Sequence, residues 1–197
     1  MLSDLIRARC SFIVLFCCVL THATPTFGFE EVTGELKDDT YNFVSHYRVL
    51  IKASPEEVWS VLIQLDKWMY DFELKPLAGN DGQAGQILNL YAGQPFQIQI
   101  SAAQPNRLLV IQNLPITFKN EYGTGTTVTT LHKTTEGTEV SLTMSRRYRF
   151  KGVGENAQRK QRESEVFQQQ TRAMWEQRFL PKLKELVEHS PNKQKDN

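Results

Sequence analysis

The sequence of 197 residues lacks three features that would have placed it in a class of protein at once. Its three cysteines, Cys10, Cys17 and Cys18, all lie in the first 18 residues, so the remainder can form no disulfide and no thiolate metal site. The chain has no excess charge of one sign. It has 23 basic and 22 acidic side chains, and this balance excludes the strongly basic surface of a dedicated nucleic-acid-binding protein. No apolar run reaches the about 20 residues that a membrane-spanning helix needs.

Residues 1–23 have the pattern of a secretory signal peptide. Two arginines precede the apolar run from Phe12 to Leu20, and small residues follow at about Ala23. A basic start, a short apolar core and a small-residue exit are typical of such signals. We therefore expect an exported protein, periplasmic or secreted, cleaved after Ala23 or, as a second choice, after Gly28. An uncleaved N-terminal anchor is the alternative.

The rest of the chain divides by composition into an arm, a domain and a tail. Residues 24–40 are polar and are expected to form a flexible arm, while the polar residues 190–197 are expected to be a disordered tail. Residues 41–189 carry the apolar periodicity of a single domain that is long enough to bury a core. Without the signal peptide, basic and acidic side chains are equal in number.

Local patterns mark the first strand and the first helix of this domain. From Tyr41 to Lys52 apolar and polar residues alternate, which predicts a strand with one buried face. Ser54 is then placed to cap a helix, Pro55 suits its first position, and Glu57 completes a capping box. Apolar residues at helical spacing follow from Val58 to Leu65.

Turn residues divide the middle of the chain into short runs with strand character. The runs cover residues 86–91, 96–102, 108–112, 126–132 and 138–150. Phe96, Ile98 and Ile100 alternate with polar residues, so one face of this sheet is expected to be buried and the other wet. Since the connections are short, we expect an antiparallel meander.

A long final helix is predicted from about Glu155 to Glu188. Its apolar side chains form two adjoining stripes. These are Phe167, Thr171 and Met174, and then Trp175, Phe179, Leu183 and Leu186. Pro181 removes one backbone donor and is expected to kink the helix. The helix is long enough to cover the buried face of the sheet, which predicts an α+β domain.

Two segments carry a resemblance to a known superfamily. Residues 53–59 (Ala-Ser-Pro-Glu-Glu-Val-Trp) and 65–69 (Leu-Asp-Lys-Trp-Met) resemble the N-terminal signature of START-like (SRPBCC) domains. The likeness runs from about Tyr41 to Val187, and in character the chain is similar to the polyketide cyclase/dehydrase and lipid-transport group. It implies a helix-grip fold, a curved antiparallel sheet wrapped around a long C-terminal helix and an apolar cavity. That group is usually cytoplasmic, so the leader is a departure.

The resemblance implies a ligand-binding cavity between the sheet and the final helix. Aromatic and apolar side chains would line such a cavity. The candidates are Trp68, Met69, Tyr91, Ile98, Tyr148, Trp175 and Phe179. Each of these side chains can instead belong to a packed core.

Arg146 is the one charged residue that breaks the pattern of the last strand. It shares its face with apolar residues, which are Val140, Leu142, Met144, Tyr148 and Phe150. A guanidinium that enters an apolar interior needs an anionic partner. That partner is either a protein carboxylate such as Glu73 or Glu121, or the acidic head group of a bound ligand. A twist or bulge that turns Arg146 outward is the third alternative.

No catalytic residue, cofactor or metal is expected. His46, His132 and His189 are scattered and lack the spacing of metal ligands, and no nucleophile motif is present. We therefore expect a protein that binds a hydrophobic or amphipathic, lipid-like small molecule without turnover. The alternatives are a cyclase or dehydratase that uses the same cavity, and an interaction module whose core is filled.

The expected partners are a hydrophobic small molecule or lipid, and no nucleic acid. A basic run surrounds the turn into the final helix. It comprises Arg146, Arg147, Arg149, Lys151, Arg159, Lys160 and Arg162. Such a run is either a solvated face or a surface for transient contact with an anionic membrane during lipid loading.

Overall fold

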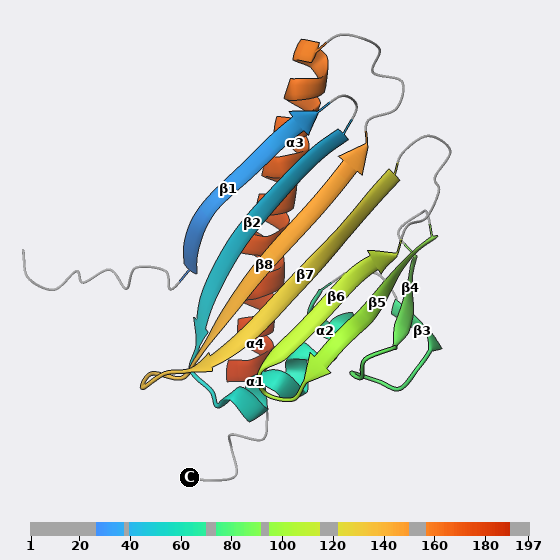
Figure 1. Ribbon diagram of the computed structural model, residues 1–197. Helices are drawn as coiled ribbons and strands as arrows, with labels where there is room; N and C mark the ends of the chain where they lie inside the picture. The colour runs from blue at the N-terminus through green and yellow to red at the C-terminus, as the bar shows by residue number, and fades with distance from the viewer. Residues whose placement is uncertain are drawn as a thin grey trace, which may run out of the picture.

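The protein is an α+β domain in which one long helix lies against a single antiparallel sheet (Figure 1). The computed structural model describes residues 27–37, 40–69, 74–91, 95–114, 122–149 and 157–189. Its strands are β1 (Phe27–Lys37), β2 (Thr40–Ile51), β3 (Leu74–Ala78), β4 (Ile87–Tyr91), β5 (Pro95–Gln104), β6 (Leu108–Leu114), β7 (Tyr122–Lys133) and β8 (Thr138–Arg149). Its helical segments are α1 (Pro55–Leu62), α2 (Leu65–Trp68), α3 (Ala157–Met174), the π turn η1 (Trp175–Phe179) and α4 (Leu180–Glu188).

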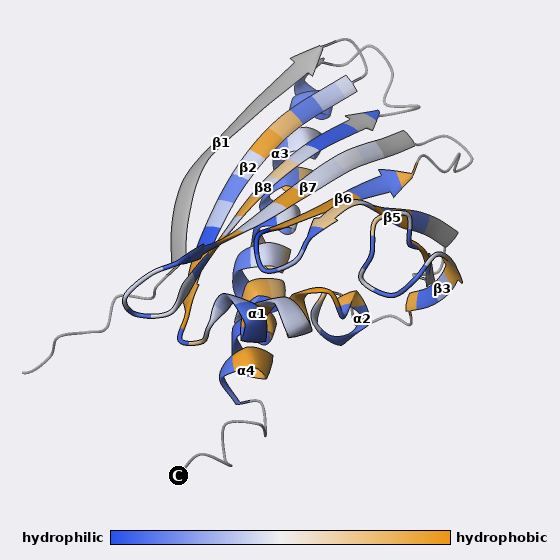
Figure 2. Cartoon of the chain, turned by 60° about the horizontal axis from the view of Figure 1, so that its bottom comes forward, coloured by the Kyte–Doolittle hydropathy of each residue, from blue (hydrophilic) through white to orange (hydrophobic). Residues whose placement is uncertain are grey.

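The sheet has eight strands in the order β1-β2-β8-β7-β6-β5-β4-β3, and all neighbours are antiparallel. The five runs predicted in the middle of the chain are strands β4 to β8 and form the expected meander. The hairpin of β1 and β2 completes the sheet because β2 pairs with β8. Figure 2 shows the sheet arching over α1, α2 and α4. The predicted helix-grip architecture is confirmed.

Strand β1 replaces most of the expected flexible arm. It occupies Phe27–Lys37 and pairs with β2, although residues 24–40 were expected to lack regular structure. A register shift between Glu30 and Thr33 explains why alternation did not reveal it. A bulge moves later residues to the opposite face, so Phe27 and Phe29 are out of phase with the apolar residues that follow. The predicted signal peptide and the tail lie outside the described residues.

The inner face of the sheet carries the core, as the alternation predicts. In β2, Phe43 and Tyr47 are each only 2% exposed, and Val49 and Ile51 are completely buried. In β8, alternate residues from Val140 to Met144 are buried in the same way. The side chains at the intervening positions of these two strands point to the outer face and are half-buried or exposed.

Helix α1 begins where the sequence predicts. The Ser54 hydroxyl accepts a hydrogen bond from the Glu57 backbone N–H (3.3 Å), and the Glu57 carboxylate accepts one from the Ser54 N–H (2.7 Å). The helix ends at Leu62, and Trp68 Nε1 donates to the Leu62 carbonyl (3.0 Å). That bond holds α2 against the end of α1.

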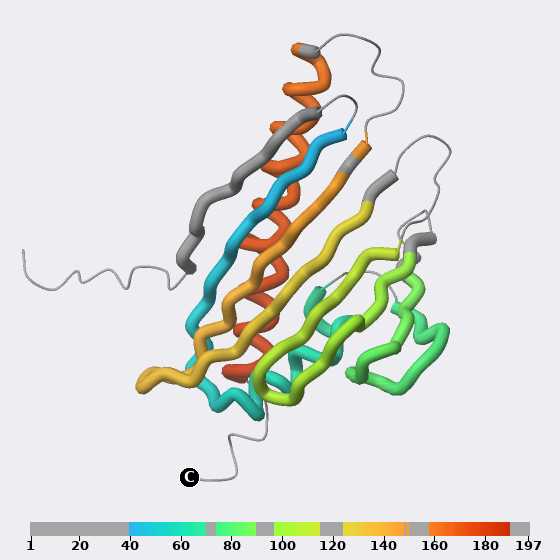
Figure 3. The backbone as a smooth tube through the Cα atoms, in the orientation of Figure 1, coloured from blue at the N-terminus to red at the C-terminus, as the bar shows by residue number. Residues whose placement is uncertain are grey.

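The final helix runs alongside β2. The Tyr41 hydroxyl donates to Gln168 Oε1 (2.6 Å) within α3, and Lys184 Nζ donates to the Leu50 carbonyl (2.9 Å) near the C-terminal end of α4. Figure 3 shows α3, η1 and α4 as one continuous helix behind the sheet. No helix in the described ranges is long and apolar enough to cross a membrane.

The π turn η1 lies just before Pro181, and the kink predicted at this proline stays a prediction. The Leu180 N–H donates to the Trp175 carbonyl, five residues back, immediately before the proline. This wider turn leaves room for a proline ring that would collide with the preceding turn of a regular helix. One residue of the predicted apolar stripe is wrong. Leu186 is 37% exposed, and Val187, which is 1% exposed, is buried in its place because the π turn shifts the phase of the helix.

Candidate functional site

An aromatic cluster joins the final helix to the sheet and to α2. Trp175 stacks on Tyr47 with 6.1 Å between ring centroids, and it meets Phe179 edge-on at 5.2 Å. Trp68 lies 6.3 Å from Trp175 on another side. Three of the predicted site residues are therefore neighbours, although Trp68 is more than 100 positions from the other two in the sequence.

The predicted apolar site residues whose side chains are described all lie in the core. Trp68, Met69 and Ile98 are each 1% exposed, Trp175 is fully buried, and Phe179 is 3% exposed. Tyr91 and Tyr148 lie in β4 and β8, but their side chains are outside the described part of the structure. The five described residues thus pack against other protein groups, and contact with a ligand remains a prediction for all seven.

Arg146 lies on the inner face of β8. It is directly opposite Phe43 of β2 on one side and Gly125 of β7 on the other, and both ladders are regular there. The Arg146 side chain is half-buried. Because the register shows no bulge at this point, the alternative in which Arg146 turns outward is wrong. Glu73 and Glu121, its two predicted protein partners, lie outside the described residues.

Gly125 makes the room that the Arg146 side chain occupies. A Cβ atom at position 125 would overlap Arg146 Cδ and would come within 2.9 Å of Nη1. The arginine therefore extends across the face of β7 at a glycine, where that strand has no side chain. The run from Gly123 to Thr126 is regular β structure within β7, which begins at Tyr122.

Polar groups accompany Arg146 on the inner face. Ser45, Thr127 and Thr129 are each at most 2% exposed. Burial raises the pKa of the Tyr47 hydroxyl above its ordinary value, whereas the nearby Ser45 hydroxyl and the positive charges of Arg172 and Arg146 act in the opposite direction. This part of the interior therefore combines an aromatic wall with hydroxyl groups and a cation.

Trp175 contributes a polar group without an acceptor. Its ring is completely buried, and Nε1 has no hydrogen-bond partner among the described residues. A buried N–H is normally paired, because an unpaired one costs about 1–3 kcal/mol. The indole therefore presents a free donor within the aromatic cluster.

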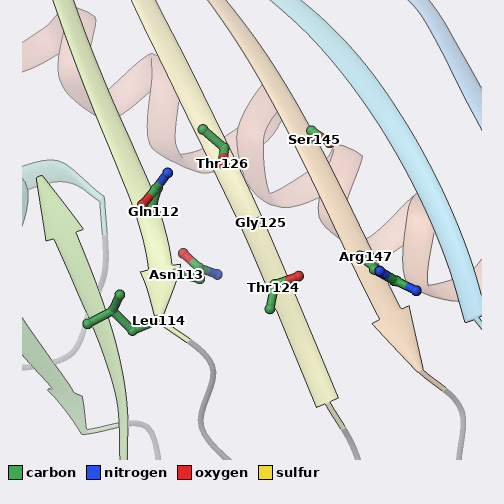
Figure 4. Close-up of a pocket in the computed structure, with 8 residues that line it drawn as sticks. All are labelled: Gln112, Asn113, Leu114, Thr124, Gly125, Thr126, Ser145 and Arg147. Atoms are coloured by element: carbon green, nitrogen blue, oxygen red, sulfur yellow. The ribbon is translucent and has the colours of Figure 1, made fainter. Parts of the chain in front are cut away.

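A second feature lies on the opposite, outer face of the sheet, where the sequence predicted only a wet surface. A shallow pocket of about 300 Å³ crosses β6, β7 and β8 (Figure 4). Its lining residues are Gln112, Asn113, Leu114, Thr124, Gly125, Thr126, Ser145 and Arg147. Strand alternation alone places Gln112, Thr124, Thr126, Ser145 and Arg147 at outward positions, but the adjacency of the strands depends on long-range pairing. Within the described ranges, no group of three or more side chains is arranged to hold a metal ion.

Comparison with known proteins supports the fold alone. No protein-family model and no curated protein matches the sequence. The solved structure of SA2116 from Staphylococcus aureus, a protein of unknown function, is similar with a TM-score of 0.61 and 12% identity, over 78% of this chain and 98% of that one. CalU16 from Micromonospora echinospora has a TM-score of 0.53 and 17% identity over 84% and 88% of the two chains. The Aha1 dimer from Colwellia psychrerythraea has a TM-score of 0.51 and 18% identity over 75% and 98%.

Proposed function

We propose that this protein is a START-like binding protein that holds an amphipathic molecule with an acidic head group between the sheet and the final helix. The observation that carries the proposal is the position of Arg146, a cation on the inner face of a sheet whose neighbouring inward positions are apolar or hydroxylated. The apolar body of the ligand would lie along the helix, where Phe167 and Met174 are only partly buried.

The energetics of Arg146 favour an acidic head group over a neutral one. A guanidinium loses hydration when it is covered by apolar groups, and an ion pair with good hydrogen bonds offsets that loss. A carboxylate can accept two parallel hydrogen bonds from a guanidinium, which is the strongest pairing available to arginine. The absence of a side chain at Gly125 leaves room for the Arg146 side chain on the inner face.

The indole of Trp175 supplies a second donor in the same region. Arg146 influences the pKa of Tyr47, and the Tyr47 ring stacks on Trp175, so the three side chains belong to one neighbourhood. A head-group oxygen that reaches the indole would satisfy the free Nε1 hydrogen. Such a bond fixes orientation in an otherwise apolar site.

A pair of probes that differ only in the head group tests the proposal. Oleate and oleyl alcohol are titrated into the protein, and binding is followed by tryptophan fluorescence and calorimetry. Arg146→Met should weaken oleate binding about tenfold or more, because a charge-assisted hydrogen bond is lost, and should leave oleyl alcohol binding nearly unchanged. Arg149→Met, which removes the same charge from an exposed position of the same strand, is the matched control.

Two results would overturn the proposal. One is that neither probe binds saturably. The other is that Arg146→Met loses several kcal/mol of stability without a change in probe affinity, which is the signature of a structural pair with a protein carboxylate. Normal stability with selective loss of oleate binding supports the head-group role.

Export and membrane contact complete the proposal. Cleavage after Ala23 would leave β1 whole, whereas cleavage after Gly28 would remove the two residues that pair with Val49 and Arg48. The first site is therefore favoured for a periplasmic or secreted protein. Loading from an anionic membrane would use the exposed basic side chains of α3, such as Arg159 and Arg162. Intact-mass measurement of the chain in cell fractions tests export, and a chain that begins at Met1 in the cytosol would contradict it.

A further inference from the structure

The outer-face pocket has the composition of an anion site. Five of its six polar side chains come from alternate positions of three neighbouring strands: Gln112 of β6, Thr124 and Thr126 of β7, and Ser145 and Arg147 of β8; the sixth, Asn113, is adjacent to Gln112. The register places Gln112 opposite Thr126, and Thr126 opposite Ser145. Figure 4 shows these side chains on the sheet face that is turned away from the final helix. A guanidinium, three hydroxyl groups and two amides thus line one space that has no acidic lining residue.

None of these five side chains is used to hold the fold together. Within the part of the chain that the structure describes, none of them makes a side-chain hydrogen bond or an ion pair. Other hydroxyls on the same face do so: Thr143 contacts His46 Nδ1 (3.0 Å), and Ser141 donates to Glu139 (3.2 Å). Donors that are grouped in a pocket and left without partners are available to a ligand.

We propose that this pocket binds a tetrahedral oxyanion, a phosphate or sulfate group, carried by a small hydroxylated molecule or by a lipid head group. Arg147 makes the charged contact, since a guanidinium matches phosphate oxygens in pairs. The Thr124, Thr126 and Ser145 hydroxyls donate to the remaining oxygens or to neighbouring hydroxyls of the ligand. A volume of about 300 Å³ is at the lower end of ligand sites, which suits a head group rather than an acyl chain.

This site is independent of the proposed function. Arg146 and Arg147 are adjacent in β8 and therefore point to opposite faces of the sheet. A ligand at Arg147 lies outside the layer between sheet and helix, so the oleate experiment and the oxyanion experiment can fail separately.

The test uses sn-glycerol 3-phosphate as a free probe and two kinds of vesicle as the lipid source. NMR titration of the whole domain follows the backbone amides of β6 to β8 and the Gln112 side-chain amide, with glycerol as the uncharged control. Vesicles of phosphatidylglycerol in phosphatidylcholine are compared with vesicles of phosphatidylcholine alone by co-sedimentation. We expect saturable shifts at these positions at roughly millimolar glycerol 3-phosphate, in the range of a shallow exposed site.

Variants separate the pocket from the general charge of the face. Arg147→Gln should weaken binding about tenfold, and Thr126→Val, which keeps the volume but loses the hydroxyl, about threefold. Arg149→Gln removes an exposed charge of the same strand outside the pocket and should change affinity by less than about twofold at physiological salt. Circular dichroism and the melting temperature establish that each variant is folded.

Each outcome decides the proposal. Binding of free glycerol 3-phosphate that depends on Arg147 supports a soluble ligand, and Arg147-dependent binding to phosphatidylglycerol vesicles alone supports a lipid head group. Shifts that glycerol reproduces, equal losses in Arg147→Gln and Arg149→Gln, or no saturable shift up to roughly 10 mM would overturn it.

Discussion

Phe179 provides a quantitative test of how the final helix is fixed to the sheet. Its ring is 3% exposed and meets Trp175 edge-on at 5.2 Å, in the π turn that brings both residues to the inner face. Truncation of a buried phenylalanine to alanine costs about 3–5 kcal/mol, through lost apolar burial and an unfilled cavity. In a domain of this size each kcal/mol lowers the melting temperature by about 2–4 °C. We therefore expect Phe179→Ala to lower it by roughly 6–20 °C.

The matched control is Leu186→Ala in the same helix. Leu186 is 37% exposed, so its truncation should cost less than about 1 kcal/mol. Urea unfolding followed by tryptophan fluorescence measures the stability of both variants. The ring of Trp175 contacts Phe179, and Trp68 lies beside Trp175, so the fluorescence of these tryptophans reports on this part of the core. Equal losses for the two variants would refute the packing of the helix described above. A small loss for Phe179→Ala with reduced oleate affinity would show that the ring faces ligand space instead.

Three further predictions concern the cap, the space beside Arg146 and the effect of pH. Ser54→Ala should cost about 1 kcal/mol in urea unfolding because a first-turn donor loses its acceptor, whereas Ser60→Ala should cost far less; equal losses would contradict the observed cap. Gly125→Ala should displace the Arg146 side chain and weaken oleate binding in the same titration, and unchanged affinity would show that the guanidinium is not needed there. Burial raises the pKa of Tyr47 above 10.0, so the folded state keeps a proton that the unfolded chain loses, and stability should fall as the pH rises past about 10. Tyr47→Phe should make that fall less steep in urea unfolding at several pH values, and an unchanged slope would contradict it.

Elements with a strong local signal could be predicted from the sequence. The start of α1 depends on Ser54, Pro55 and Glu57, which act within one turn, and the capping bonds form as expected. The buried face of β2 follows from strict alternation. Strand β1 was missed because the register shift between Glu30 and Thr33 interrupts that alternation. The strand is stabilised by its pairing with β2, and a pattern within β1 alone does not reveal this pairing.

The final helix shows the same limit on a smaller scale. With regular α-helical spacing, the buried face that contains Trp175 and Leu183 would also contain Leu186. The π turn holds more residues than an α turn, so Val187 lies on the inner face instead. Pro181 predicts a kink in this region, and the proline alone does not predict a π turn.

The candidate sites could be predicted only in part. The face of Arg146 follows from the parity of β8, and the structure confirms it. The space beside it depends on Gly125, which is 21 positions away and becomes its neighbour only through the register of β7 and β8. The outer-face pocket needs the adjacency of three strands, which alternation within one strand does not specify.

Native mass spectrometry of the protein purified from its own compartment tests the central claim most directly. The account predicts a bound molecule that, after extraction, contains an apolar body and one acidic group, and that is absent or strongly reduced in Arg146→Met while Arg149→Met retains it. The same molecule at equal occupancy in Arg146→Met would contradict the role of Arg146. A chain that carries no ligand and binds neither oleate nor oleyl alcohol when tested would contradict the proposed function.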